Sequence, residues 1–333
     1  MEMEAAGFNE FQNKLFLDEI YSKNDSLSLT NIEDCNQLRI LSWNIERGAN
    51  PDALAAYINQ VKPDVVCLQE VDWGNERTNN ADVLDVIARS TSMTGFFGTE
   101  FFEIQTPSRP KELAGGGVQG NAILTRILPQ KCFRIELPIA FDWLTPPEHK
   151  KSIVQRENRI GARFALGVEF DYFGRRVVIC STHLEDKDGG IDGRFAQFKS
   201  LVETIHTDPS ESVTSVIAGD LNSLENWITF VKKLNKRSPS NKKPWYLSEC
   251  RWWKEQLLPE TGYSDPFDCN DWTYQRKMIY REKLDWIVVR NCKVSQHGIG
   301  DFNTSDHRPV WAQITLLERG HQRRWPQGSL CPQ

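Results

Sequence analysis

Acidic, amide and imidazole side chains stand at the ends of apolar segments along this chain. Asn44 and Glu46 follow an apolar run in LRILSWNIERG. Glu70 and Asp72 do the same in PDVVCLQEVD. A charged group at the end of a buried strand is costly unless it is paired or bound to a metal ion. These positions are therefore candidates for chemistry, although any single one of them is more commonly a turn former.

Later segments repeat this arrangement in VVICSTHLED, VTSVIAGDLNS, KLDWIVV and FNTSDHRPVW. The polar residues that they place beside apolar runs are His183, Glu185, Asp220, Asn222, Asp285, Asp306 and His307. Carboxylate and amide oxygens are ligands that Mg²⁺ and Mn²⁺ prefer, whereas zinc and copper favour softer donors. The imidazoles suit proton transfer or contact with a phosphate oxygen. Repeated interruptions of one chemical type predict a site for a hard divalent cation with histidines beside it.

The elements that must position these residues are short, rich in β-branched residues and bounded by Gly, Pro, Asn or Asp, which is typical of strands. The predicted strands are Leu38–Trp43, Asp64–Glu70, Gly120–Thr125, Ala162–Phe170, Arg176–His183, Val213–Ala218, Leu284–Val289 and Pro309–Thr315. Helical spacing predicts one helix that begins at Asn50 and Pro51, one that contains Val83, Leu84 and Ile87, and one from Phe195 to Ile205. This alternation predicts two sheets packed face to face with helices outside.

Eight short motifs carry a resemblance to a known family. In order, they are WNIERG, LQEVD, QGNAILTR, ENRIGARF, STHLED, GDLNS, LDWIVV and SDHRPV. From about residue 38 to residue 316, the series resembles the endonuclease/exonuclease/phosphatase superfamily. The resemblance implies a DNase I-like, four-layer α/β sandwich of two packed, mostly antiparallel sheets with helices outside. It also implies a phosphoric ester hydrolase that uses Mg²⁺ (or Mn²⁺), in which an activated water attacks the phosphate in line.

The resemblance implies roles for the residues that match its motifs. Asn44, Glu70 and Asp306 match the metal site, with Glu70 as the direct ligand. Asp220 matches the aspartate that orients or deprotonates the attacking water. Asn222 would contact the phosphate or the water. We therefore expect these side chains to converge at one end of the two sheets.

Histidines and further polar residues complete the expected site. His307 would touch a phosphoryl oxygen and stabilise developing charge, and Asp285 would hold its ring by a hydrogen bond. His183 falls where the family places a histidine or tyrosine near the scissile phosphate. Arg159 matches a phosphate-contacting arginine, with a surface salt bridge as the alternative. Asn121 would line the pocket, with a strand-edge turn residue as the alternative.

Composition and length limit the classes of protein that the chain can represent. The 333 residues suffice for a large core, and we expect a polar N-terminal extension over 1–36, a catalytic domain over 37–317 and a flexible tail over 318–333. The net charge of −5 argues against tight nonspecific binding to duplex DNA. No membrane-spanning run or secretory signal is evident, so a cytoplasmic location is expected, with the nucleus as a further possibility.

The cysteines give a second indication of the compartment. The chain has eight of them, none with CxxC spacing, which argues against a zinc site. Cys67 and Cys180 lie inside apolar runs and are predicted to be small buried core residues. We therefore expect reduced thiols rather than a disulfide framework.

The substrate is expected to be set by the segment from Trp227 to Glu282, between the Asp220 and Asp285 strands. This segment starts basic and then becomes aromatic. The aromatic residues either pack the segment onto the domain or form a stacking platform for unpaired bases, and Trp252 and Trp253 are the pair to test. Asp265, in GYSDPFD, is assigned to a turn.

A phosphodiester substrate is expected, with nucleic acid ends or single strands favoured over lipid. The alternative is a phospholipid or small-molecule phosphoesterase, similar to a sphingomyelinase or an inositol phosphatase, whose aromatic residues enter a membrane interface. A catalytically silent binding module is a third interpretation, which the intact set of candidate residues disfavours. The sequence does not distinguish endonucleolytic from exonucleolytic action, and it does not indicate an oligomeric state.

Overall fold

The computed structural model describes residues 19–316, except 26, 28, 35, 108, 155, 209–210, 225–242, 245, 277–279 and 302–303. Within these residues, one sheet has eight strands and a second has five. The first sheet has the order β1 (Ile20–Lys23), β4 (Thr94–Glu103), β5 (Val118–Thr125), β3 (Val65–Trp73), β2 (Gln37–Arg47), β15 (Val310–Leu316) and β14 (Cys292–Ile299), and β7 (Arg159–Gly161) pairs with β4. The second has the order β13 (Asp285–Arg290), β10 (Thr214–Asp220), β9 (Arg175–His183), β8 (Phe164–Tyr172) and β6 (Lys131–Glu136).

The remaining elements are helices and one hairpin. The helices are α2 (Pro51–Val61), α3 (Val83–Thr91), α4 (Lys151–Val154), α5 (Gly190–Ile205), α7 (Glu249–Trp252) and α8 (Leu258–Glu260), with a π-helical turn at Trp253–Leu257. Short 3₁₀ turns lie at Ile32–Asp34, Glu76–Thr78, Lys111–Leu113 and Glu148–Lys150. A separate hairpin is formed by β11 (Tyr274–Arg276) and β12 (Tyr280–Glu282). None of the helices in the described residues is both long and apolar enough to span a membrane.

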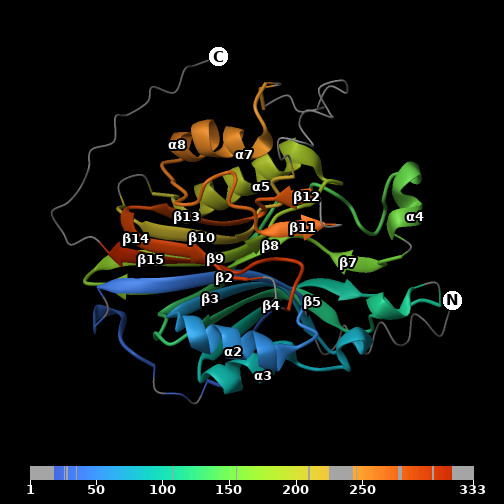
Figure 1. Cartoon of the computed structure of the whole chain (residues 1–333), viewed down its shortest axis with the longest axis horizontal. Coiled ribbons are helices and arrows are strands. Elements are labelled where there is room, and N and C mark those ends of the chain that lie inside the picture. Colours follow the sequence, from blue (N-terminus) through green and yellow to red (C-terminus); the bar gives the residue numbers. More distant parts are fainter. Residues whose placement is uncertain are drawn as a thin grey trace.

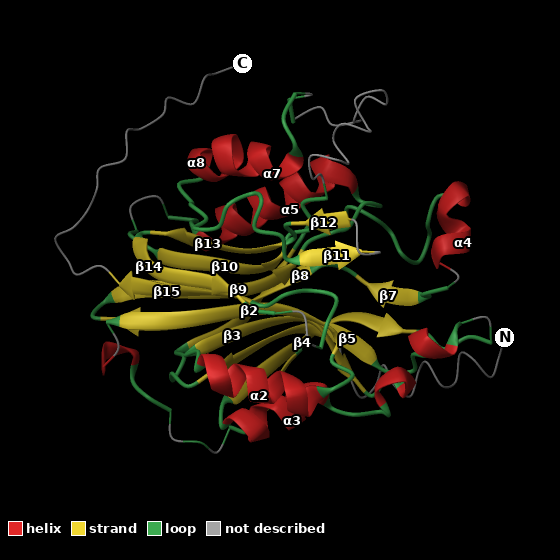
Figure 2. Cartoon of the chain, in the orientation of Figure 1, coloured by secondary structure: helices red, strands yellow, loops and turns green. Residues whose placement is uncertain are grey.

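Apolar side chains form three buried layers between four layers of secondary structure. One cluster joins the inner faces of the two sheets, and includes Ile40 and Ile123 from the first sheet and Phe164 and Ile179 from the second. A second cluster packs α5 and α7 onto the outer face of the smaller sheet. A third packs α2 and α3 onto the outer face of the larger sheet. The order helix, sheet, sheet, helix is visible in Figure 2, and it confirms the expected four-layer α/β sandwich.

Two parallel strand pairs interrupt otherwise antiparallel sheets. β2 and β3 are parallel and are connected by α2, and β9 and β10 are parallel and are connected by α5. Figure 1 shows α2 on one outer side of the sandwich and α5 on the other. Parallel strands end at the same edge of a sheet, so the carboxyl ends of all four strands lie at one end of the molecule. That end is where the polar residues of the motifs are placed.

The sequence predicts eight of the strands in the described residues, and it does not predict β1, β4, β6, β7, β11, β12 and β14. All eight predicted strands and the three predicted helices are present, and the side chain of Asn50 caps α2 by accepting a hydrogen bond from the Ala53 amide (3.2 Å). Of the strands that were not predicted, β4 contains two glycines, and β6 and β14 contain exposed polar residues, which weakens the strand pattern. The expected N-terminal extension over 1–36 contains a strand, since Ile20 begins β1. Phe11, Leu15, Phe16 and the tail 318–333 lie outside the described residues.

Of the two expected uses of Trp252 and Trp253, the structure shows packing onto the domain and not a stacking platform. Trp252 and Trp253 are 4% and 0% exposed. The ring of Trp253 lies against Phe198, with centroids 4.9 Å apart, and against Trp286, with centroids 6.0 Å apart. The segment therefore uses these two rings to pack onto α5 and the smaller sheet, and they are not accessible to a base. Trp245 lies outside the described residues.

We expect Trp253→Ala to lower the free energy of unfolding by about 3–5 kcal/mol, because it leaves a cavity in the core. Chemical denaturation monitored by circular dichroism measures this change. Leu128→Ala is the matched control, since Leu128 is 63% exposed and its truncation should change stability by less than about 0.5 kcal/mol. Equal stability of the two variants would contradict the packing role.

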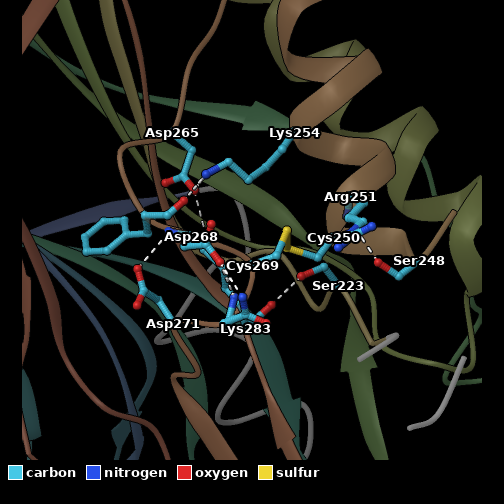
Figure 3. The surroundings of a disulfide bond; sticks show 12 residues. Ser223, Ser248, Cys250, Arg251, Lys254, Asp265, Asp268, Cys269, Asp271 and Lys283 are labelled. Carbon is cyan, nitrogen blue, oxygen red and sulfur yellow. Dashed lines mark hydrogen bonds and ion pairs between the residues drawn. A yellow bond between two sulfur atoms is a disulfide. The ribbon is translucent and has the colours of Figure 1, made fainter. Parts of the chain in front are cut away.

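A disulfide and an ion pair also anchor this segment, and the disulfide is contrary to expectation (Figure 3). Cys250 and Cys269 form a disulfide, whereas reduced thiols were expected. Asp265 lies outside the helices and strands, which is compatible with the expected turn, and its buried side chain lies 3.0 Å from the buried ammonium of Lys283. Residues distant in sequence form both contacts, so local spacing gives no signal for them. As expected, Cys67 and Cys180 are buried and unpaired; of the other described cysteines, Cys132 and Cys292 are also free.

Candidate active site

Strand register places three polar residues in one row at the end of the smaller sheet. Asp220 of β10 pairs with His183 of β9 on one side and with Asp285 of β13 on the other. The preceding Gly219 allows this close pairing, because a Cβ there would lie 1.8 Å from the Thr182 carbonyl oxygen. The row faces the ends of β2 and β3 in the larger sheet, since Asn44 of β2 is hydrogen-bonded to Asp220.

Backbone irregularities aim the residues of the larger sheet. The pairing of β2 with β3 shifts between Asn44 and Arg47, and the pairing of β3 with β5 shifts between Leu68 and Val71. Within these bulges, Glu46 and Glu70 have φ values of 45° and 56°, in the left-handed region. A bulge re-aims side chains at a strand end, and unusual backbone of this kind clusters at functional sites. The bulges therefore account for the direction of Glu70, which strand alternation does not predict.

The carboxylate of Asp220 is the centre of the polar cluster. Its Oδ2 accepts a hydrogen bond from Asn44 Nδ2 (3.1 Å) and lies 3.5 Å from His183 Nε2 and 3.7 Å from His307 Nε2. Its Oδ1 accepts a hydrogen bond from the Asn222 amide (2.9 Å), and Asn222 Nδ2 donates to the Leu184 carbonyl (2.9 Å). Burial raises the pKa of Asp220 above the ordinary carboxyl range. This places a carboxylate with increased basicity between two imidazoles.

His307 is held by a buried carboxylate and by its own loop. Its Nδ1 lies 2.8 Å from Asp285 Oδ2. Its backbone amide donates to Ser305 Oγ (3.0 Å), which in turn donates to the Asn44 carbonyl (2.7 Å). Burial alone would lower the pKa of His307, but the carboxylates of Asp285 and Asp220 outweigh it and raise that pKa above its usual value. His307 is therefore a fixed cation with its Nε2 directed at the cluster.

His183 has the opposite electrostatic character. Burial, together with the positive charges of Arg163 and His307, lowers its pKa well below the usual histidine value. Its ring is therefore neutral at physiological pH. The site thus combines one charged and one neutral imidazole beside the same carboxylate, so that one ring can stabilise negative charge while the other offers a hydrogen bond without adding charge.

Three acidic residues gather beside this cluster at the surface. The Asp306 amide donates to Glu46 Oε2 (3.0 Å), and Asn44 Nδ2 lies 3.3 Å from Glu70 Oε1. Burial and the like charges of Glu70 and Glu46 raise the pKa of Asp306 to about 6. Asp306 retains 40% side-chain exposure, so the group is accessible. Oxygen donors that repel one another at an accessible position fit a divalent cation such as Mg²⁺.

A second set of potential ligands is already internally paired. Within the described residues, the ligand atoms of Asp220, Asp285 and His307 lie within 4.8 Å of one another. The Nδ1 atom of His307 is bound to Asp285, and its raised pKa keeps the imidazole protonated. A protonated imidazole cannot bind a metal ion. The carboxylates around Glu70 are therefore the better match for a cation.

Two residues expected to contact phosphate lie at the edge of the cluster. Arg159 is buried, with its guanidinium carbon 3.5 Å from the Trp143 ring and 4.1 Å from the Phe101 ring, so it is not a surface salt bridge. Asn121 lies on β5 opposite the bulge that carries Glu70. Its Nδ2 donates to the Phe164 carbonyl (3.1 Å), and its buried Oδ1 has no hydrogen-bond partner among the described residues.

Arg163 also lies at the site, although its sequence motif predicted no role for it. Its guanidinium lies between Glu100 (3.0 Å) and Glu185 (3.4 Å), and its charge acts on both His183 and Glu70. Arg163 belongs to the same ENRIGARF motif as Arg159. The motif predicts an arginine at the site but does not show which of its two arginines acts on the catalytic residues. The structure thus adds Arg163 to the set that controls the charge of the site.

Two packed sheets with this cluster at one end define the DNase I-like class of α/β sandwich. A model of the Endonuclease/Exonuclease/phosphatase family matches residues 41–307. The chain therefore belongs to the endonuclease/exonuclease/phosphatase family. Comparison with curated protein sequences gives no match.

Solved structures show the same fold at low sequence identity. An endonuclease/exonuclease/phosphatase from Beutenbergia cavernae DSM 12333 has a TM-score of 0.57 and 20% identity, covering 84% of this chain and 72% of that one. The human Nocturnin catalytic domain with bound sulfate anion has a TM-score of 0.54 and 16% identity, covering 89% and 99%. ANGEL2, a 2′,3′-cyclic phosphatase, has a TM-score of 0.53 and 15% identity, covering 84% and 95%.

Proposed function

We propose that this protein is a phosphodiesterase that hydrolyses nucleic acid ends or single strands with the help of Mg²⁺ or Mn²⁺. The observation that supports the proposal is the set of polar groups around one buried carboxylate oxygen, Asp220 Oδ2. Asn44 Nδ2, His183 Nε2 and His307 Nε2 all lie within 3.7 Å of it. This arrangement can accept a proton from water and stabilise an anionic phosphate in the same place.

Each residue of the cluster has a separate part in the proposed reaction. Asp220 Oδ2 takes the proton of the attacking water, which its raised pKa favours. The cationic Nε2 of His307 donates a hydrogen bond to a phosphoryl oxygen, while Asp285 keeps the ring in place. Asn222 orients the water or the phosphate. Because His183 is neutral, its ring can form a hydrogen bond to an oxygen of the phosphate without charge repulsion from His307, and the leaving oxygen takes its proton from solvent.

The cation would be held by Glu70 and Asp306, with Asn44 beside them. A bound divalent ion would neutralise charge on the phosphate and on the leaving oxygen. Glu70 can act as a ligand for the cation because its carboxyl group remains ionised. Burial opposes that ionisation, but Arg47 and His307 outweigh it and lower the pKa of Glu70.

Aromatic groups beside the site favour nucleic acid as the substrate. The ring of Tyr274 lies against His307, with centroids 4.8 Å apart, and Trp272 is half-buried two residues earlier. Aromatic rings next to a phosphate site suit the stacking of unpaired bases. These two residues replace the buried Trp252 and Trp253 as the expected stacking groups.

A lipid phosphodiester is a second candidate, supported by a different surface. Ile139 and Leu144 are 72% and 63% exposed in the connection between β6 and β7. This connection leaves the sheets at the same end as the site, because Arg159 of β7 pairs with Glu103 at the end of β4. Exposed apolar side chains there are suited to a membrane interface.

A substrate comparison separates these candidates. Purified protein with Mg²⁺ is incubated with a single-stranded oligonucleotide, with sphingomyelin vesicles and with an inositol polyphosphate, and Asp220→Asn serves as the control for contaminating activity. Cleavage of the oligonucleotide is expected. Cleavage of the vesicles alone would transfer the assignment to the lipid candidate. The absence of turnover on every phosphate ester would contradict the enzymatic proposal and favour a binding module.

We expect Asp285→Ala to lower kcat by about 10–100-fold, because His307 loses the partner that fixes its ring and its charge. The double variant Asp285→Ala, His307→Ala should be scarcely slower than His307→Ala alone, since groups that act as a unit are non-additive. Steady-state kinetics on an oligonucleotide measures both effects. Fully multiplicative losses would show that the two residues act independently.

A further inference from the structure

A cavity of about 370 Å³ adjoins the proposed catalytic centre. It lies between residues 267–272, the end of β14 and the side chain of Arg308. Its walls include apolar and aromatic groups, Phe267, Trp272 and Ile299, together with polar groups such as Asn270. The volume falls in the usual range for sites that bind small organic groups.

A short segment joins this cavity to the catalytic histidine. Thr273 follows the cavity residue Trp272, and its carbonyl accepts a hydrogen bond from the Arg308 amide (2.6 Å). The hydroxyl oxygen of Thr273 accepts a hydrogen bond from the Asp285 amide (3.0 Å). The next residue, Tyr274, lies against the His307 ring. The segment 272–274 therefore borders both the cavity and the catalytic histidine.

The cavity holds a guanidinium that no carboxylate of the described residues pairs with. Arg308 Nε donates to the Gly300 carbonyl (2.7 Å) and Nη1 donates to the Trp272 carbonyl (3.3 Å). Its guanidinium carbon lies 4.5 Å from the Trp272 ring, and that of Arg281 lies 4.4 Å from the same ring. Asp271 supplies one opposing charge, and its Oδ2 accepts a hydrogen bond from the Asp268 amide (2.7 Å).

We infer that this cavity binds a second phosphate of the substrate with its attached nucleoside. Arg308 contacts the phosphate, Arg281 adds positive charge, and Trp272 holds both guanidinium groups in place. A guanidinium presents planar donors that match phosphate oxygens, and the apolar walls suit a sugar and base. The inference rests on the proposed function and narrows it to substrates with phosphates on adjacent units, which every nucleic acid strand has and a phospholipid with a single phosphodiester lacks.

Binding measurements test this site without relying on turnover. Isothermal titration calorimetry with Mg²⁺ present compares thymidine 3′,5′-bisphosphate with the 3′- and 5′-monophosphates. The wild-type protein should bind the bisphosphate at least about tenfold more tightly than either monophosphate, the scale of one charge-assisted contact. Arg308→Gln should bring this ratio close to one, Arg281→Gln should reduce it, and Arg308→Lys should retain part of it.

Lys293→Gln provides the matched control, because it removes an exposed positive charge from the opposite end of β14. Its bisphosphate preference should equal that of the wild type. Thermal unfolding verifies that each arginine variant is folded, and the exposed position of Arg281 keeps the test valid if Arg308→Gln unfolds. A wild-type ratio near one, or a ratio that neither arginine changes, would overturn the inference while leaving phosphodiester hydrolysis intact. A failure to hydrolyse any phosphate ester would instead contradict the proposed function.

Discussion

Asp220→Asn is expected to lower kcat on an oligonucleotide by at least about 100-fold, the scale for removing a positioned general base. The substitution keeps the shape of the side chain, and the amide oxygen can still accept the hydrogen bond from Asn44 Nδ2. It removes the negative charge and the capacity to take a proton. It also removes one of the two carboxylates that keep His307 charged, so charge stabilisation weakens as well.

The position of Asp220 calls for a control on folding. Asp220 is buried, so a fall in activity must be separated from a fall in the amount of folded protein. Thermal unfolding of the variant provides this measurement. Asp25→Asn is the matched substitution, because Asp25 is exposed and lies next to Asn24, whose side chain contacts the end of α3 away from the site. Near-normal turnover of folded Asp220→Asn would show that another group accepts the proton.

The sequence predicts the strand ends well because burial and chemistry conflict there. Asp220 follows an apolar run and His307 stands directly before one, and no packing argument explains a carboxylate or an imidazole at such positions. The row formed by His183, Asp220 and Asp285 then follows from parallel and antiparallel pairing of three predicted strands. For these residues, the sequence pattern alone is enough to predict that they lie close together.

Other parts of the site depend on information that the pattern lacks. The direction of Glu70 depends on a bulge and on a left-handed φ of 56°, which an acidic residue in a strand does not indicate. Trp253 and Trp272 are the same residue type in the same segment, yet one is buried in the core and the other lines a cavity. Only the packing of the segment against α5 and β14 distinguishes them. The Asp265–Lys283 pair likewise results from that packing.

Removal of divalent metal is expected to abolish turnover, with a loss of at least about 1,000-fold after dialysis against EDTA, and Mg²⁺ or Mn²⁺ should restore it. The physical reason is the accessible group of like charges at Glu46, Glu70 and Asp306. Burial and the two glutamates raise the pKa of Asp306 to about 6. The positive charges of the protein therefore do not fully balance the negative charge of these carboxylates. A bound divalent cation would remove this repulsion and supply the charge that the phosphate requires.

A variant and a second readout make the metal prediction specific to this site. Glu70→Gln should raise the Mg²⁺ concentration for half-maximal rate by about 10–100-fold, the scale for weakening a metal site. Glu203→Gln, on the exposed face of α5, should leave it unchanged. Mg²⁺ at 100 times its dissociation constant should also stabilise the wild-type fold by about 2.7 kcal/mol, which thermal unfolding detects independently of activity. Full turnover by metal-free protein would contradict the metal requirement. The same Mg²⁺ dependence in Glu70→Gln as in the wild type would contradict the assignment of Glu70 as a metal ligand, because no other accessible group of oxygen donors in the described site carries the same charge.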